Sequence, residues 1–137
     1  MVHRRPAVPL IVASLLVAVL ALAGCGSKNT PAVCSDADAL QSSIGALTDL
    51  KLDQESLSTL QDKLDQVKTD ATQLKTDAEA QYADQISAVD SAVTAVVTSV
   101  DAAATSPDAQ TLAAVGTALQ ALQTSLSQLK TALESTC

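Results

Sequence analysis

The sequence predicts an all-α protein, an antiparallel helical bundle or coiled-coil-like array of three to four helices. Apolar residues recur at steps of three and four along most of positions 34–137, which places them on one face of a helix. Only two glycines and one proline interrupt this region. A cysteine stands at each end of it, Cys34 and Cys137. We therefore expect a disulfide between the N- and C-terminal ends to close the helical array.

The first expected helix begins at Ser35 and fades near Thr48. Ser35 is followed three residues later by Asp38, a spacing that fits a capping box. Leu50 and Leu52 follow in a short connection, and we expect them to cover the end of the bundle. The apolar face of this helix consists of Ala37, Leu40, Ile44 and Leu47.

The second expected helix starts after Asp53, a good N-cap residue. Its apolar stripe is narrow, like the a/d seam of a coiled coil, and residues 66–70 and 73–77 repeat the pattern Gln-apolar-Lys-Thr-Asp. The acids at 62, 65, 70, 77 and 79 alternate with lysines, which predicts a solvated helix face. The stripe consists of Leu57, Leu60, Leu64, Val67, Ala71, Leu74 and Ala78.

The spacing then changes to steps of four through Tyr82 and Ile86. This change fits either a stutter in one long helix or a turn near residues 80–84. The absence of glycine and proline there favours continuity, although one helix over 54–104 would measure about 76 Å. Both alternatives stay open. We expect Tyr82, the only aromatic residue, to fill the core where the spacing slips, with its hydroxyl at the rim.

The clearest boundary is Ser106-Pro107-Asp108. Serine can cap a helix, proline suits the first helical position and aspartate favours the positive helix end. The last helix is then expected to run almost to Cys137. Its apolar positions are Leu112, Val115, Leu119, Leu122, Leu126, Leu129 and Leu133.

The N-terminal residues have the pattern of an export signal. Arg4 and Arg5 precede an apolar run over positions 9–23, which ends in Leu22-Ala23-Gly24-Cys25. This stretch resembles the lipobox of bacterial lipoproteins, and the Ala/Thr/Asp-rich remainder is similar in composition to actinobacterial envelope proteins. The resemblance implies that residues 1–24 are a signal peptide and that Cys25 carries a diacylglycerol. It leaves residues 25–33 as a lipidated tether and residues 34–137 as the helical domain.

Two other interpretations of this segment remain open. Ala21-Leu22-Ala23 also fits an ordinary signal-peptide cleavage site, and the apolar run could stay uncleaved as an anchor. The cysteine count favours lipidation, because three is an odd number for an exported chain and a lipidated Cys25 leaves Cys34 and Cys137 as a pair. Disulfides persist outside the cytoplasm. The alternative for the pair is two free thiols that act as metal ligands or as a redox couple.

Composition limits the function. Beyond residue 24 the chain has six lysines and fifteen acidic residues, a formal charge of −9, and no arginine or histidine. An acidic chain is unsuited to nucleic acid. Without histidine or a glycine-rich phosphate loop we expect no enzyme, catalytic residue, metal site or cofactor besides the lipid on Cys25. We expect a lipid-anchored protein on the extracytoplasmic face of the cell membrane, acting as a structural or protein-interaction module. The partner would be an envelope protein or a second copy, and the alternative is a carrier for a lipid or other apolar ligand.

Overall fold

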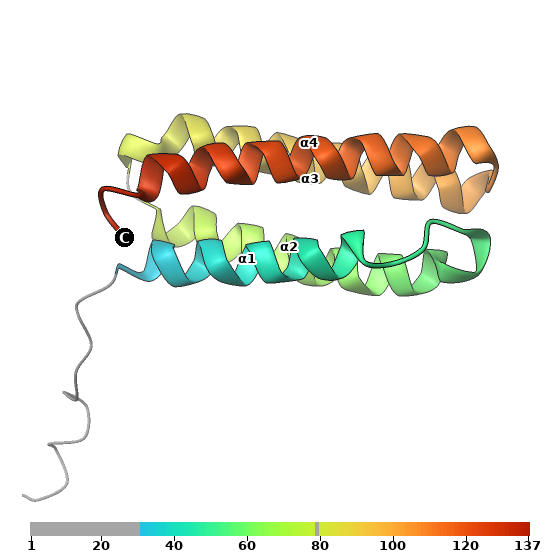
Figure 1. The fold of residues 1–137 in the computed structure, drawn as a ribbon, viewed down its shortest axis with the longest axis horizontal. Helices are drawn as coiled ribbons and strands as arrows, with labels where there is room; N and C mark the ends of the chain where they lie inside the picture. Colours follow the sequence, from blue (N-terminus) through green and yellow to red (C-terminus); the bar gives the residue numbers. More distant parts are fainter. Residues whose placement is uncertain (1–30, 79) are drawn as a thin grey trace, which may run out of the picture.

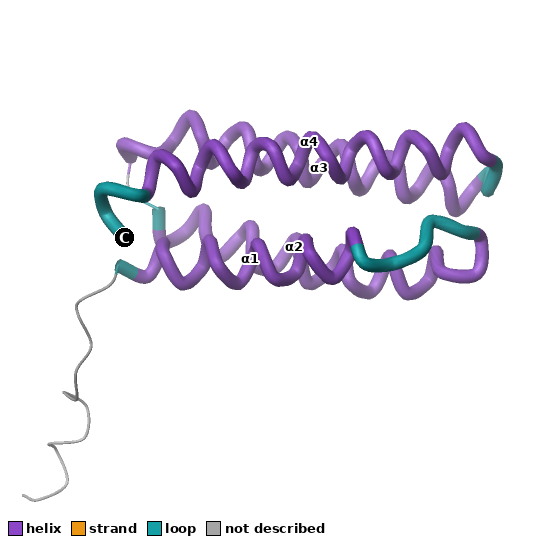
Figure 2. Tube along the Cα trace, in the orientation of Figure 1, coloured by secondary structure: helices purple, strands orange, loops and turns teal. Residues whose placement is uncertain are grey.

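The computed structural model describes residues 31–78 and 80–137, which form an antiparallel four-helix bundle (Figure 1). No β-strand occurs in these residues (Figure 2). The expected all-α fold is therefore confirmed, with four helices rather than three. The helices are α1 (Ala32–Thr48), α2 (Leu57–Asp77), α3 (Ala83–Thr105) and α4 (Ala109–Leu133), and the short 3-10 helices Gln54–Ser56 (η2) and Ala80–Tyr82 (η3) precede α2 and α3.

The four helices run alternately up and down, and each packs against the helices before and after it. The most extensive contacts join α3 to α4 and α1 to α2, and these two pairs are held together by α2–α3 and α1–α4 contacts. In Figure 1 the two pairs form two layers, and α1 begins at the end of the bundle where the chain terminates. An odd number of short reversals between four helices produces this proximity of the two ends.

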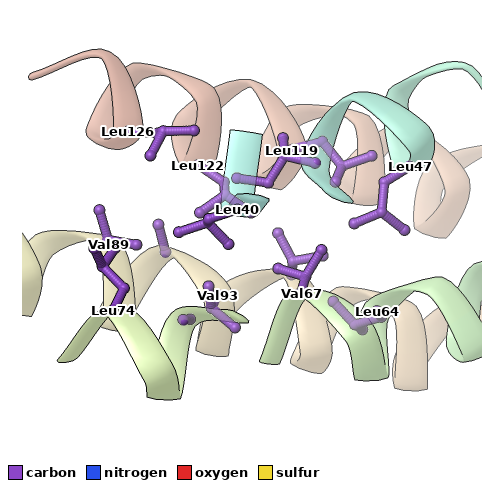
Figure 3. Close-up of a cluster of buried hydrophobic side chains, with 14 of the residues drawn as sticks. Leu40, Leu47, Leu64, Val67, Leu74, Val89, Val93, Leu119, Leu122 and Leu126 are labelled. Atoms are coloured by element: carbon purple, nitrogen blue, oxygen red, sulfur yellow. The ribbon is translucent and has the colours of Figure 1, made fainter. Parts of the chain in front are cut away.

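The core is a continuous apolar column between the four helices. In Figure 3, Leu40 of α1, Val67 of α2, Val93 of α3 and Leu122 of α4 point towards one another. No polar or charged side chain is among the fully buried residues of the described chain. The stripes expected from the sequence are confirmed, because nearly every stripe position is buried: Ala37, Leu40, Ile44, Leu47, Leu57, Leu60, Leu64, Val67, Ala71, Leu74, Val115, Leu119, Leu122, Leu126, Leu129 and Leu133.

Of the two alternatives left open across residues 78–86, the turn is the one that occurs, since α2 ends at Asp77 and α3 begins at Ala83. Ala78 leaves the helix in an extended conformation, and η3 completes the reversal. In one continuous helix the apolar stripes of α2 and α3 could not pack against each other. Folding back buries both halves in one core, and Tyr82 and Ile86 are buried as a result.

Two of the three expected caps are also wrong. The helix α1 begins upstream of Ser35, at Ala32, and the Ser35 hydroxyl donates to the Ala32 carbonyl 2.9 Å away instead of capping. Burial of Val33 and Cys34 explains the earlier start, because it adds another apolar contact to the core. At the start of α4 the cap is Asp108, whose Oδ1 accepts from the backbone N–H of Thr111 at 2.9 Å, and not Ser106.

The third cap and the expected cover of the bundle end are confirmed. Asp53 Oδ1 accepts from the Ser56 backbone N–H at 2.9 Å in a reciprocal capping box. Leu50 and Leu52 pack half-buried against the core beside it. A methyl group at Gly116 would stand 3.4 Å from Leu52 Cδ1, so the glycine lets this connection lie directly on α4.

Candidate functional site

The end of the bundle where α1 begins and α4 finishes holds the chemically distinctive groups, and we call it the disulfide end. Cys34, in the first turn of α1, is bonded to Cys137, with an S–S distance of 2.02 Å and Cα atoms 5.9 Å apart. Cys34 is 6% exposed, whereas Cys137 is largely exposed. The predicted pairing is confirmed, and it links the first turn of α1 to the turn after α4, 103 residues away in the sequence.

A short turn after α4 carries Cys137 to its partner. The backbone N–H groups of Thr136 and Cys137 both donate to the Leu133 carbonyl, each with an N···O distance of 2.8 Å. The Thr136 hydroxyl is hydrogen-bonded to the Tyr82 hydroxyl, and Tyr82 itself is only 5% exposed. The expected role of Tyr82 is confirmed, because its ring fills the core and its hydroxyl reaches the rim.

A groove of about 290 Å³ lies between α1 and α4 beside the disulfide. Its rim carries a cation, since Lys130 Nζ lies 3.2 Å from Asp38 Oδ1 and also donates to the Gln41 side chain. These contacts give the positive charge of Lys130 a partner and link α4 to α1. The groove is lined by Cys34, Ala37, Asp38, Lys130, Leu133, Glu134 and Cys137.

A second polar feature runs along the contact between α1 and α2. Asp70 accepts hydrogen bonds from the Ser43 hydroxyl of α1 and, at 2.9 Å, from Gln66 Nε2. Asp77 accepts from Gln73 Nε2 at 2.6 Å. Both aspartates are half-buried, so they lie at the edge of the expected solvated face. The acids Asp62 and Asp65 are exposed as expected.

The carboxyl group of Asp36 completes this feature from α1. Its Oδ2 atom is buried and accepts no hydrogen bond from the described residues. The pKa of Asp36 is raised above its ordinary value of 3.8, chiefly because burial disfavours the charged form. A hydrogen bond with Asp77 and the negative charges of Asp77 and Asp70 raise the pKa of Asp36 further.

The heptad repeat of α2 is the sequence signal for this carboxylate cluster. Asp70 and Asp77 occupy the same place in the repeated pattern Gln-apolar-Lys-Thr-Asp, seven residues apart. A seven-residue separation returns to nearly the same side of a helix, so both had to flank the apolar seam. Flanking positions contact the neighbouring helix, and here that neighbour is α1.

Other charged side chains form exposed ion pairs on the helix surfaces. Lys75 Nζ lies 3.4 Å from Asp90 Oδ2 and links α2 to α3, and Lys68 lies 3.6 Å from Asp65 on one face of α2. Among the described residues no group of three or more His, Cys, Asp or Glu side chains could hold a metal ion. A hollow of about 260 Å³ at the opposite end of the bundle lies between Leu50, Leu52 and α4.

The predicted lipidation site, Cys25, lies outside the described residues, as do the expected signal peptide 1–24 and most of the tether 25–33. Within the described part, the segment Ala80–Thr105 is long and apolar enough to cross a membrane by length and composition alone. Residues such as Val96 and Val100 of this segment face the bundle core, which equally accounts for its composition.

Comparison with known proteins found no protein-family model, no curated protein and no solved structure that matches this chain.

Proposed function

We propose that the protein is a lipoprotein of the bacterial cell envelope, anchored to the extracytoplasmic face of the membrane by a diacylglycerol on Cys25. Its helical bundle acts as a non-enzymatic structural or protein-interaction module. The lipobox-like Leu22-Ala23-Gly24-Cys25 after an apolar run supports the anchor. The closed bundle, with polar and charged side chains outside and an apolar column inside, supports the module.

The observation that carries the proposal is the position of the start of α1 at the disulfide end (Figure 1). Ala32 is seven residues from Cys25, a separation of at most about 25 Å in extended chain. A lipid on Cys25 would therefore hold the disulfide end close to the membrane. The helices, of which α4 has 25 residues and spans about 37 Å, would carry the opposite end away from it.

Two helices from different layers of the bundle, α2 and α4, offer different surfaces to a partner. The helix α2 alternates acids with Lys63, Lys68 and Lys75, whereas α4 has Lys130 as its one charged residue and otherwise exposes Ala, Gln, Ser and Thr. Charged surfaces favour selective encounter with a complementary partner, and uncharged polar surfaces favour close packing without charge desolvation. An interaction module can use either surface, so both are tested.

The anchor is tested by Cys25→Ser in cells fed a radiolabelled fatty acid. We expect the wild-type protein to take up label and partition into detergent, and the variant to lose both properties. Ser27→Ala, two residues away, is the matched control and keeps both. Equal labelling of Cys25→Ser and wild type would remove the lipoprotein assignment.

The module is tested by crosslinking in cells, with one variant on each layer. Lys68→Glu changes the charged surface and Thr124→Lys changes the uncharged one, and both positions are exposed. We expect one defined envelope protein, or a second copy, to be crosslinked by the wild type and lost in one variant whose far-UV circular dichroism is unchanged. Crosslinks that survive substitutions over both layers would exclude the interaction function.

The groove at the disulfide end favours a second candidate, a carrier for an apolar ligand. About 290 Å³ lined by Ala37, Leu133 and the disulfide is enough for a short stretch of acyl chain. A native-state ligand must raise thermal stability. We expect a carrier to show a melting shift with phosphatidylglycerol that Ala37→Trp abolishes by filling the groove. Absence of a shift in the wild type would exclude this candidate.

A further inference from the structure

The two halves of the disulfide differ in their access to solvent. Cys34 is 6% exposed and belongs to the core, whereas Cys137 is exposed in the turn after α4. The groove of about 290 Å³ between α1 and α4 reaches the bond, and its lining includes the exposed Asp38 and Glu134. A thiol that enters this groove from water can therefore approach the Cys137 sulfur more readily than the Cys34 sulfur.

The bundle keeps its non-covalent contacts around this bond when the bond opens. Val33 and Leu133 are buried in the core on the two helices that the disulfide joins. The turn that carries Cys137 is held by backbone hydrogen bonds to the Leu133 carbonyl and by the contact between the Thr136 and Tyr82 hydroxyls. Opening the disulfide does not require the helices to separate first, so a thiol can react with the folded protein.

The position of Cys34 suits it to be the sulfur that leaves. Cys34 is the third residue of α1, which begins at Ala32. The leaving sulfur in thiol–disulfide exchange departs as a thiolate, and the partial positive charge of a helix N-terminus stabilises a thiolate. The acid of α1 that lines the same groove, Asp38, has its charge paired with Lys130 at 3.2 Å. Attack at Cys137 thus releases the anion where the helix favours it.

We propose that Cys137 is a site of thiol–disulfide exchange, which an external thiol reaches through the groove at the disulfide end. The incoming thiolate attacks Cys137 Sγ and forms a new S–S bond, while the bond to Cys34 Sγ breaks and the Cys34 thiolate takes a proton from water. The incoming sulfur is oxidised and the Cys34 sulfur is reduced, so no other oxidant takes part. A monothiol stops at the mixed disulfide, whereas the second thiolate of a dithiol displaces Cys137 and leaves two free cysteines.

The exchange changes the stability of the bundle at a single position. Cys34 stays buried afterwards, which shields it from a second thiol. The link that closed about 100 residues is gone, so the melting temperature should fall by roughly 20 °C. The stability of the domain then depends on the thiols around it. This inference rests on the described disulfide and is independent of the lipid on Cys25.

The test exposes the full chain, purified in detergent without denaturant, to excess glutathione, followed by acid quenching and mass spectrometry of peptides. We expect the glutathione adduct on Cys137 to exceed the adduct on Cys34 several-fold. Equal adducts on both cysteines, or adducts that form only after urea is added, would overturn the proposal. Peptide mapping reads Cys25 separately, so an error in the lipid assignment leaves this result unchanged.

A pair of variants tests the route through the groove. Glu134→Trp adds bulk to the groove lining and should slow the exchange several-fold, whereas Glu134→Gln, the matched control, keeps the size of the side chain and should not slow it. Both variants should keep the far-UV circular dichroism of the wild type. Equal rates for Glu134→Trp and wild type would contradict access through the groove.

A comparison of reagents identifies the class of thiol that the site accepts. Reduced thioredoxin, a protein dithiol, is compared with glutathione by the rate of disulfide opening per thiolate. A faster reaction with glutathione assigns the site to small thiols, and a faster reaction with thioredoxin assigns it to a protein dithiol. Failure of both reagents to open the disulfide in the folded protein would exclude exchange at Cys137.

Discussion

Replacing Cys137 with serine opens the covalent link between the first turn of α1 and the turn after α4. Cys137 is exposed, so the substitution removes little packing and acts mainly on the unfolded chain. The sequence separation of 103 residues makes the closed loop long, and for about 100 residues the chain-entropy relation gives about 4.7 kcal/mol. A domain of this size has a total stability of roughly 5–15 kcal/mol.

Urea unfolding of wild type and Cys137→Ser, followed by circular dichroism, measures this contribution. We expect the free energy of unfolding to fall by about 4 kcal/mol and the melting temperature to fall by roughly 20 °C. The m-value should rise, because the uncrosslinked unfolded chain exposes more surface. The double variant Cys34→Ala/Cys137→Ala breaks the same single bond and should lose a similar amount.

Two results would refute this reasoning. A loss below about 1 kcal/mol would mean that the unfolded chain is already compact enough for the link to cost it little entropy. An unchanged m-value combined with a large loss would place the effect in the folded state, in the packing around the buried Cys34.

Two further predictions concern the core and a cap. Leu122→Ala removes a side chain that is 0% exposed at the centre of the bundle, and the free energy of unfolding measured in urea should fall by about 2–5 kcal/mol. The control is Gln120→Ala at an exposed position, which should change the free energy of unfolding by less than about 0.5 kcal/mol. The Ser56 side chain and the Ser56 backbone N–H lower the pKa of Asp53 below its ordinary 3.8, so its charge stabilises the fold above that value and loses this effect as the pH falls through the folded pKa. Asp53→Asn, which keeps a cap acceptor but cannot titrate, should be less stable than wild type at pH 7. Melting curves should show the gap closing as the pH falls below 3.8 and through the lowered pKa of Asp53, and a gap that is constant with pH would contradict the pKa assignment.

The apolar positions of all four helices could be assigned from the sequence because burial dominates the energetics of a small helical domain. Residues such as Leu60 and Leu129 recur at helical spacing and have no other low-energy place than the core. The pairing of Cys34 with Cys137 was equally accessible, since any antiparallel arrangement with an even number of helices returns the chain to its start.

Local signals at helix ends were less reliable, because several residues compete to cap the same turn. Ser106 and Asp108 are both good caps, and the chosen one is Asp108, which together with Thr111 satisfies backbone groups reciprocally. At the start of α1, Ser35 was overridden by the burial of Val33, which contributes more than a cap on an exposed turn.

The sequence by itself determined the all-α class, the buried face of each helix and the closing disulfide. It also carries the lipobox-like motif on which the proposed anchor rests. Tertiary structure alone decided that the chain reverses at residues 78–82, because no glycine or proline marks the turn. The reversal is favoured by burial of the apolar stripes of α2 and α3 in one core. Tertiary structure also decided that Asp70 and Asp77 are half-buried at the edge of the contact with α1, where Asp70 accepts a hydrogen bond from Ser43. The heptad spacing fixes the side of α2 on which they lie, but the charge environment of Asp36 exists only once the two helices meet.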